Sequence, residues 1–318
     1  MKATEKSGSH FGHLFLIVFV IIFLLSFGHV FSREGIGFPA PTWGIGFGNL
    51  KNFTGLRFNL ADRDIGTING INITGWKAKE SHISGTVNGF SLGLMPMAET
   101  LRGIQVGILG TGAEREMAGI NLGLLGAGCG GSIAGINVGG LGIGCGGNMT
   151  GINIGGLGVG CGGNLTGLNI GGLGVGSGAN LEGINIGGLG VGCGANMTGL
   201  NLAGLGVGAG NELSGVTFAG LGAGAPRFYG LAAAGIGLGG HELTGVFVTP
   251  GTIRVVEDGT FRGLAISGFN HIQGTQRGLA IGIVNYAYRL KGVQIGLINI
   301  VRDNPAGRRV LPIININF

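Results

Sequence analysis

Four cysteines, Cys129, Cys145, Cys161 and Cys193, are the residues whose type and spacing first suggest chemistry. The first three are evenly spaced along the chain, and Cys193 follows Cys161 at twice that spacing. Regularly spaced thiols in an exported chain are candidates for disulfides or for a metal site. A straight column of four ligands cannot form the tetrahedron that zinc requires. Packing of small interior residues accounts for the spacing, and one disulfide between two of the first three cysteines is an open alternative.

The other candidate catalytic residues are scattered. His82, His241 and His271 lie in different repeat units, without a Ser, Cys or carboxylate pattern that would complete a triad. The segment that contains Asp62 and Asp64 is typical of a polar turn. Glycine-rich matches to dinucleotide-binding loops recur throughout the chain, and none of them opens a helix after a strand. We therefore expect no enzyme activity and no catalytic, cofactor-binding or metal-binding residues.

Composition narrows the class of protein. Glycine accounts for 76 of 318 residues, with only 7 prolines, and 44% of residues are hydrophobic. The glycines do not fall at every third position, which excludes collagen. The apolar content and the net charge of +5 are not those of a disordered chain. The remaining explanation for so much glycine is a repeat.

A strict repeat begins at Gly119 and runs through six closely similar units of equal length, of which the last begins at Gly199. A looser version, whose units vary slightly in length, extends in both directions. Its marker is the residue two places before the unit glycine, found at Phe53, Ile68, Ile83, Leu101, Met117, Ile133, Met149, Leu165, Leu181, Met197, Leu213, Phe228, Leu243, Phe261, Gln276 and Leu290. Such self-similarity is typical of an array whose units stack on one another to bury a continuous core.

Within the unit from Gly151 to Thr166 the pattern is that of strands. Ile152 and Ile154 alternate with Asn153, and a second alternating stretch follows the glycine pair 155–156. We expect six interior side chains, namely Ile152, Ile154, Leu157, Val159, Cys161 and Leu165, and an outer surface of Asn, Thr and Gly. The asparagines recur at the same place in every unit, so their amides can hydrogen-bond along a column as a scaffold.

These patterns predict an all-β repeat solenoid of about sixteen coils over residues 53–300. The alternative is an outer-membrane β-barrel, favoured by the export signal and by the closing segment Leu311–Phe318, which ends in an aromatic residue. Up-and-down barrels alternate short and long turns and carry aromatic girdles. In the central array every turn is alike and Phe218 is the only aromatic residue, which favours the solenoid.

The two ends of the array are expected to be capped. Residues 33–52 form the expected N-terminal lead or cap, and residues 301–318 the C-terminal cap strand. The two longest spacings between repeat markers predict insertions, at Met95–Thr100 and at Thr249–Gly259. Insertions in repeat arrays often carry binding surfaces.

The N-terminal segment predicts export. Lys2 and Lys6 precede the uncharged apolar run Leu14–Phe27, which is the pattern of a signal peptide over residues 1–32, cleaved after Ser32. An uncleaved anchor is the alternative. Charge is also uneven, because residues 227–318 hold nine Lys or Arg against four acids. We expect a solvated face there, with contact to an anionic surface such as lipid headgroups or polysaccharide as the alternative.

The segment Arg277–Ile300, with its stretch GVQIGLINI, and the closing LPIININF resemble a family of uncharacterised bacterial surface-repeat proteins of the leptospiral type. The central GGLGVG units are similar to its glycine-rich members, although they carry Asn where leptospiral units usually carry Gln. The resemblance implies a bacterial cell surface or outer-membrane location and no known activity.

Together these observations predict an exported cell-surface or envelope protein with a structural or adhesive role. The alternative is an integral outer-membrane barrel protein. Envelope polysaccharide or another surface protein are the expected partners, with membrane association as a further option and no role for nucleic acid.

Overall fold

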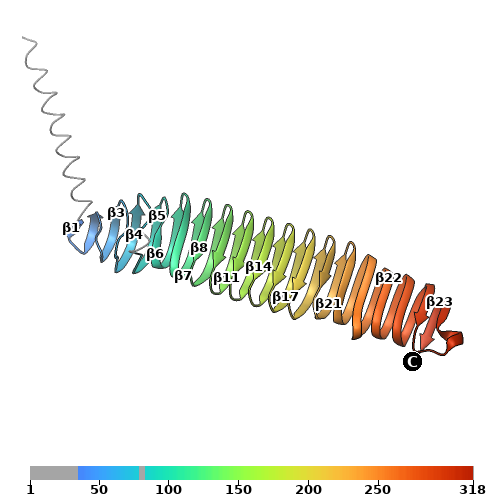
Figure 1. Ribbon diagram of the computed structural model, residues 1–318. Helices are drawn as coiled ribbons and strands as arrows, with labels where there is room; N and C mark the ends of the chain where they lie inside the picture. The colour runs from blue at the N-terminus through green and yellow to red at the C-terminus, as the bar shows by residue number, and fades with distance from the viewer. Residues whose placement is uncertain (1–34, 79–82, 318) are drawn as a thin grey trace, which may run out of the picture. The chain divides into compact units, whose positions relative to one another are not determined.

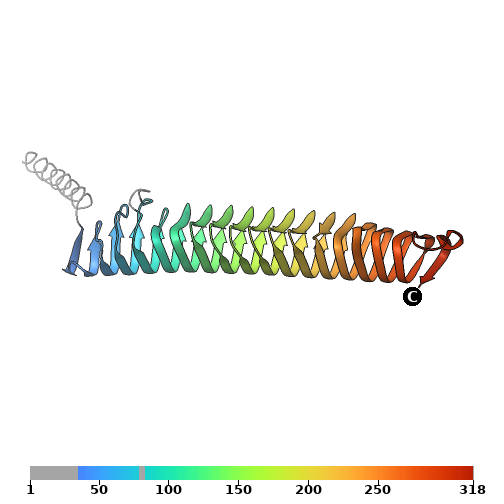
Figure 2. The same ribbon diagram turned by 60° about the horizontal axis from the view of Figure 1, so that its bottom comes forward.

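The computed structural model describes residues 35–78 and 83–317, and strands make up most of them. The signal segment and His82 lie outside the described residues. The chain divides into two compact units, Met1–Gly119 and Ile120–Phe318. Within each unit the strands of successive coils lie side by side, as both views of the ribbon show (Figures 1 and 2).

The first unit opens with an antiparallel hairpin of β1 (Ile36–Ala40) and β2 (Trp43–Phe47). From β2 onward the pairing is parallel. The strands are β3 (Phe53–Asn59), β4 (Thr67–Thr74), β5 (Thr86–Gly93) and β6 (Met97–Gly107), followed by β7 (Gly110–Gly123), which crosses the boundary between the units.

The second unit alternates long and short strands, and each pairs in parallel with its counterpart in the next coil. The long strands are β9 (Ser132–Gly139), β11 (Met149–Gly155), β13 (Leu165–Gly171), β15 (Leu181–Gly187), β17 (Asn196–Ala203), β19 (Glu212–Ala219) and β21 (Arg227–Ala234). The short strands are β8 (Gly126–Cys129), β10 (Gly142–Cys145), β12 (Gly158–Cys161), β14 (Gly174–Ser177), β16 (Gly190–Cys193), β18 (Gly206–Ala209) and β20 (Gly222–Gly224). This is the predicted parallel solenoid.

The last coils are built by a single long strand. β22 (Gly237–Val301) winds on without a break, and a short 3-10 turn, η2 (Ala306–Arg308), leads to β23 (Val310–Asn317). β23 pairs with β22 in the antiparallel direction. The alternative prediction of a barrel was wrong, because coil pairs with coil in parallel register, whereas neighbouring strands of an up-and-down barrel are antiparallel.

A glycine with positive φ bends each coil at the same place. In the repeat from Gly151 to Thr166 it is Gly151, with φ of 113°. A Cβ on Gly151 would overlap the carbonyl oxygen of Gly135 in the preceding coil. The positive φ and the lack of space for a Cβ both require glycine at this position. The same conformation recurs in the second unit at Gly135, Gly151, Gly167, Gly183, Gly199, Gly215, Gly230, Gly245, Gly263, Gly278 and Gly292.

The observed interior differs from the predicted one. Ile152 and Ile154 point outward, with 38% and 37% of their surface exposed, and Leu157 is 50% exposed, whereas Asn153 is fully buried. Met149 and Asn153 are four residues apart and both face inward, so the alternation keeps its phase through Gly151. The interior is also too narrow for a large residue at Gly155, where a Cβ would overlap the carbonyl of Gly158. Val159 and Leu165 are buried as predicted, and Cys161 is half-buried.

The buried asparagines form a hydrogen-bonded column. Asn121, Asn137, Asn153, Asn169, Asn185 and Asn201 have no exposed surface. Each of the first five donates from Nδ2 to Oδ1 of the next at 2.7 to 2.9 Å. The hydrogen bonds along the column and its scaffold role agree with the prediction. The column lies in the interior, however, and not on the outer surface where it was predicted.

The predicted repeat marker at Ile83 was also wrong. The register pairs Ile68 with Val87 and Val87 with Leu101, so Val87 holds the marker position in that coil. The extra residues therefore fall between β4 and β5. The insertion predicted at Met95–Thr100 is instead the beginning of β6 and the turn before it.

Candidate functional site

The cysteines occupy one coil position, as their spacing predicts. Cys145 pairs in register with Cys129 on one side and Cys161 on the other. The thiols of Cys145 and Cys161 donate to the carbonyl oxygens of Gly147 and Gly163, each at 3.4 Å. Cys145, Cys161 and Cys193 are free thiols and half-buried.

The neighbouring thiols differ in acidity. The hydrogen bond from Cys145 is the main reason that the pKa of Cys161 lies below its usual value, and a further bond from Ser177 acts in the same direction. The same interaction raises the pKa of Cys145. Burial raises the pKa of Cys193. Cys161 is therefore the most acidic of these three thiols.

Among the described residues no ion pair or side-chain hydrogen bond joins His241 or His271 to an acid or a nucleophile. His271 stacks on Phe269 with the ring centroids 5.1 Å apart and meets the edge of Tyr286. Burial lowers the pKa of His271, and the charge of Arg254 lowers it further. In the described residues no three His, Cys, Asp or Glu side chains gather as a metal site would require.

Asp62 is not part of an exposed polar turn, contrary to the sequence interpretation. It is buried and forms an ion pair of 2.7 Å with Arg57, whose side chain has no exposed surface. Asn59 donates to Asp62 at 2.8 Å, and Asn72 and Thr74 each donate at 3.2 Å. A buried charge needs such partners. The cluster fills the interior of the first unit, and its groups are bonded to one another rather than aimed at a cavity.

The most distinctive surface of the second unit is a straight row of exposed apolar side chains, which we call the leucine column. One residue of each coil contributes, with 46% to 60% of its surface exposed. Its members are Leu125, Leu141, Leu157, Leu173, Leu189, Leu205, Leu221 and Ile236. The backbone amide of each of Leu141, Leu157, Leu173, Leu189, Leu205, Leu221 and Ile236 donates to the carbonyl of the member in the preceding coil at 2.5 to 2.8 Å, which sets the column's pitch.

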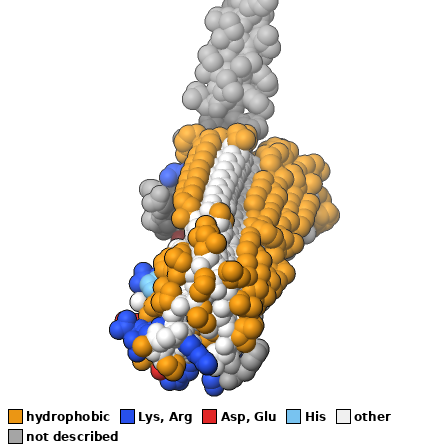
Figure 3. Space-filling model, turned by 90° about the vertical axis from the view of Figure 1, so that its right-hand side faces the viewer, with side chains coloured by type: hydrophobic (Ala, Val, Ile, Leu, Met, Phe, Trp, Pro, Cys, Tyr) orange, Lys and Arg blue, Asp and Glu red, His pale blue; other side chains and the backbone are white. Residues whose placement is uncertain are grey.

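A second apolar column runs beside the first. It consists of Val138, Ile154, Ile170, Ile186, Leu202 and Phe218, joined in register from coil to coil. Two small residues, such as Gly155 and Gly156, separate the columns in each coil. A Cβ at Gly156 would overlap the carbonyl of Gly140, so the strip between the columns stays low. Figure 3 shows straight rows of hydrophobic side chains beside a strip of backbone.

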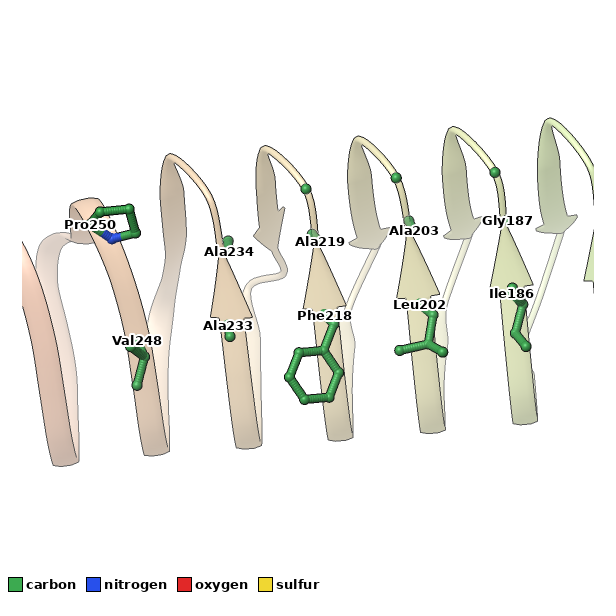
Figure 4. A pocket seen from close by; sticks show the side chains of 13 residues that line it. Ile186, Gly187, Leu202, Ala203, Phe218, Ala219, Ala233, Ala234, Val248 and Pro250 are labelled. Atoms are coloured by element: carbon green, nitrogen blue, oxygen red, sulfur yellow. The ribbon is translucent and has the colours of Figure 1, made fainter.

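The strip between the two columns forms a groove where the second column has its largest side chains. A hollow of about 600 Å³ is lined by Ile186, Leu202, Phe218 and Val248, with small residues such as Ala203 and Gly204 also along it (Figure 4). Phe218 stands beside the much smaller Ala233 of the next coil. No charged residue lines this hollow. A second hollow of about 540 Å³ lies in the last coils, between Ile266 and Ile313.

This face has the properties of a binding surface. Full burial of an aliphatic side chain is worth about 1.5–3 kcal/mol at about 25 cal/mol per Å², which corresponds to roughly 60–120 Å² of apolar surface. With about half of that area exposed on each residue of the two columns, the face presents on the order of 500 Å² of apolar surface. The largest exposed apolar patch of a monomeric protein is typically of about this size, and such patches are often functional. Ion pairs and acid–base groups are not available in the grooves, so recognition there relies on shape and apolar contact.

This surface was not predicted from the sequence, because Ile152, Ile154 and Leu157 were expected in the interior. One signal could have revealed it. Met149 and Asn153 are four residues apart, so alternation continued along the strand from the marker residue places both on the inner side and Ile152 and Ile154 on the outer side.

Among the described residues no helix is long and apolar enough to cross a bilayer. No protein-family model, curated protein or solved structure matches the chain.

Proposed function

We propose that the protein is a structural or adhesive protein of the bacterial cell surface or envelope, and that it binds through the leucine column and the second apolar column. The observation that carries the proposal is the half-exposed apolar residue at one position of every coil from Leu125 to Ile236. Burying these side chains against a partner releases the free energy that their exposure costs.

The backbone supports such a role. Parallel pairing holds each apolar side chain in register with the next, so the face is organised before a partner arrives. Binding then loses little conformational entropy. Between residues 120 and 226 the only charged side chains are Glu182 and Glu212, and neither belongs to the two columns. An apolar partner therefore meets no charge that it would have to desolvate.

The test is adsorption of the full chain to an alkyl-coated sensor and its self-association by analytical ultracentrifugation. The variant replaces Leu141, Leu157 and Leu173 with Thr, which favours strands and lacks most of the apolar surface. Each substitution is expected to remove about 1 kcal/mol of burial, so binding falls roughly a hundredfold. Circular dichroism establishes that the solenoid is intact.

A matched control replaces Thr150, Thr166 and Thr198 with Ser, at an outward position of the same repeat. This variant is expected to bind like the parent chain. Equal binding by the Leu→Thr variant and the parent would show that the columns are not the binding surface.

The proposed location draws support from the basic and apolar N-terminal segment and from the resemblance of Arg277–Ile300 to bacterial surface repeats. Fractionation of expressing bacteria, with N-terminal sequencing of the product, tests it. We expect envelope or extracellular protein beginning at Arg33. Cytoplasmic protein that keeps Met1 would contradict export.

A further inference from the structure

Several charged side chains in this protein form ion pairs with opposite charges on a nearby coil. Arg102 pairs with Glu116 at 2.8 Å and Arg115 with Glu99 at 3.2 Å in the first unit. In the second unit Arg227 pairs with Glu212 at 3.3 Å, and Arg289 with Asp303 at 3.1 Å. In these four pairs the stacking of coils brings opposite charges together.

Three other cations form a column of their own, without such pairs among the described residues. Arg262, Arg277 and Lys291 each stand directly before one of the positive-φ glycines Gly263, Gly278 and Gly292. Those glycines stack, since a Cβ on Gly278 would overlap the carbonyl of Gly263, and one on Gly292 that of Gly278. The three cations thus occupy the same place in consecutive coils, about 4.8 Å apart along the stack. We call them the cation column.

The cation column is exposed, and no ion pair within the described residues neutralises it. Like charges on adjacent strands destabilise a sheet. Three in a row create a local positive potential that a negative partner would relieve. The cation column therefore lowers the stability of the fold, whereas the ion-paired residues do not.

Apolar side chains run parallel to the cation column. Ile266, Ile281 and Ile295 each lie four residues after a cation on the same strand, which is at most about 13 Å away. They line the second hollow together with Ile283, Leu297 and Ile313. Leu297 and Ile313 are 71% and 72% exposed, more than any member of the leucine column.

We propose that the last coils of the solenoid bind the surface of a membrane that contains anionic lipid. The cation column meets the headgroups, and the apolar residues around Leu297 and Ile313 enter the boundary between headgroups and acyl chains. This combination of basic and apolar side chains is that of proteins that lie on membranes. Long cationic side chains reach headgroups while neighbouring apolar groups insert.

A lipid surface fits these observations better than a soluble polyanion does. A polyanion such as an acidic polysaccharide would neutralise the three cations but would leave the exposed isoleucines and leucine in water. Only a partner with both an anionic and an apolar layer uses both features. Ile266, Ile281 and Ile295 stand three residues after a positive-φ glycine, as Ile154 and Phe218 do, so they continue the second apolar column into the last coils. The cation column is the feature that the adhesive role does not use, and a Gln variant of its three cations therefore tests membrane binding separately from the Leu→Thr variant.

The test is cosedimentation of the full chain with vesicles of phosphatidylglycerol and phosphatidylcholine, compared with vesicles of phosphatidylcholine alone. The variant carries Arg262→Gln, Arg277→Gln and Lys291→Gln. At the usual contribution of a cation near an anionic surface, we expect about a hundredfold weaker binding to the anionic vesicles. The unfolding midpoint should stay the same or rise, since like charges are removed.

The charge-matched control carries Arg102→Gln, Arg115→Gln and Arg227→Gln, three cations that are already paired. It is expected to keep nearly all of the binding. Insertion through the apolar segment Leu14–Phe27 would be the same in both variants, so their difference isolates the cation column. A further variant, Ile283→Ser with Leu297→Ser, is expected to bind anionic vesicles more weakly as well.

Two results would overturn the proposal. The first is that the parent chain binds both kinds of vesicle equally and that the Gln variant binds them as well as the parent does. The other is failure to bind vesicles together with column-dependent binding to heparin, which would assign the cations to a soluble polyanion.

Discussion

Asn153 donates a hydrogen bond from Nδ2 to Oδ1 of Asn169 at 2.8 Å, and neither side chain has any exposed surface. Each amide in the column acts as a donor to one neighbour and an acceptor for the other. Such a chain of buried hydrogen bonds is stabilising only while it is complete, because an unpaired polar group in the interior loses its solvation without compensation.

Replacement of Asn169 by Ala should therefore destabilise the second unit strongly. It leaves Nδ2 of Asn153 and Oδ1 of Asn185 without partners, and each buried orphan costs about 1–3 kcal/mol. We expect a loss of about 2–5 kcal/mol in urea unfolding followed by circular dichroism. Asn164→Ala is the control, since Asn164 lies in an exposed asparagine column, and it should cost no more than about 1 kcal/mol. Equal losses for the two variants would contradict this account.

The repeat, the parallel stacking and the columns of identical residues could be predicted from the sequence, because Asn153 and its equivalents recur at the same place in every unit. The direction in which the side chains point could not. That direction depends on whether the alternation runs unbroken through Gly151, as it does between Met149 and Asn153, or shifts there, and glycine is compatible with both. The general preference for apolar residues inside also misled the prediction. The interior is so narrow that Ile152, Ile154 and Leu157 have no room in it.

The glycines divide into those that the fold requires and those that it tolerates. Gly151→Ala should prevent folding or cost more than about 3 kcal/mol, because it combines positive φ with an overlap on the carbonyl of Gly135. Gly160→Ala meets only the carbonyl of Gly176 at 3.7 Å. We expect it to be neutral or to stabilise by about 0.5–1 kcal/mol. Thermal unfolding of the two variants measures the difference, and a destabilising Gly160→Ala would refute the distinction.

The buried ion pair in the first unit should behave differently from the exposed ones. Arg57→Met leaves the carboxylate of Asp62 buried without its cation, which typically costs about 3–5 kcal/mol. The double variant Arg57→Met with Asp62→Asn removes both charges and keeps an amide oxygen that can accept from Asn59, so it should recover much of that loss. The control is Arg102→Gln, which breaks the exposed pair with Glu116 and should leave the unfolding midpoint almost unchanged. A double variant less stable than Arg57→Met would show that the pair is net stabilising.

The thiols of Cys161 and Cys193 should respond differently to pH. Because the pKa of Cys161 is lowered and that of Cys193 is raised, a larger fraction of Cys161 is thiolate near neutral pH, and the thiolate is the reactive form. Iodoacetamide should therefore modify Cys161 first at pH 7 to 7.5, as mass spectrometry of timed samples would show. Cys145→Ala removes the main hydrogen bond to Cys161 and should move the midpoint of its rate profile to higher pH. Ser177→Ala should move it the same way by less, and neither change should alter the profile of Cys193, two coils away. If Cys145→Ala leaves the Cys161 profile unchanged, the contact between the two thiols is not what makes Cys161 acidic.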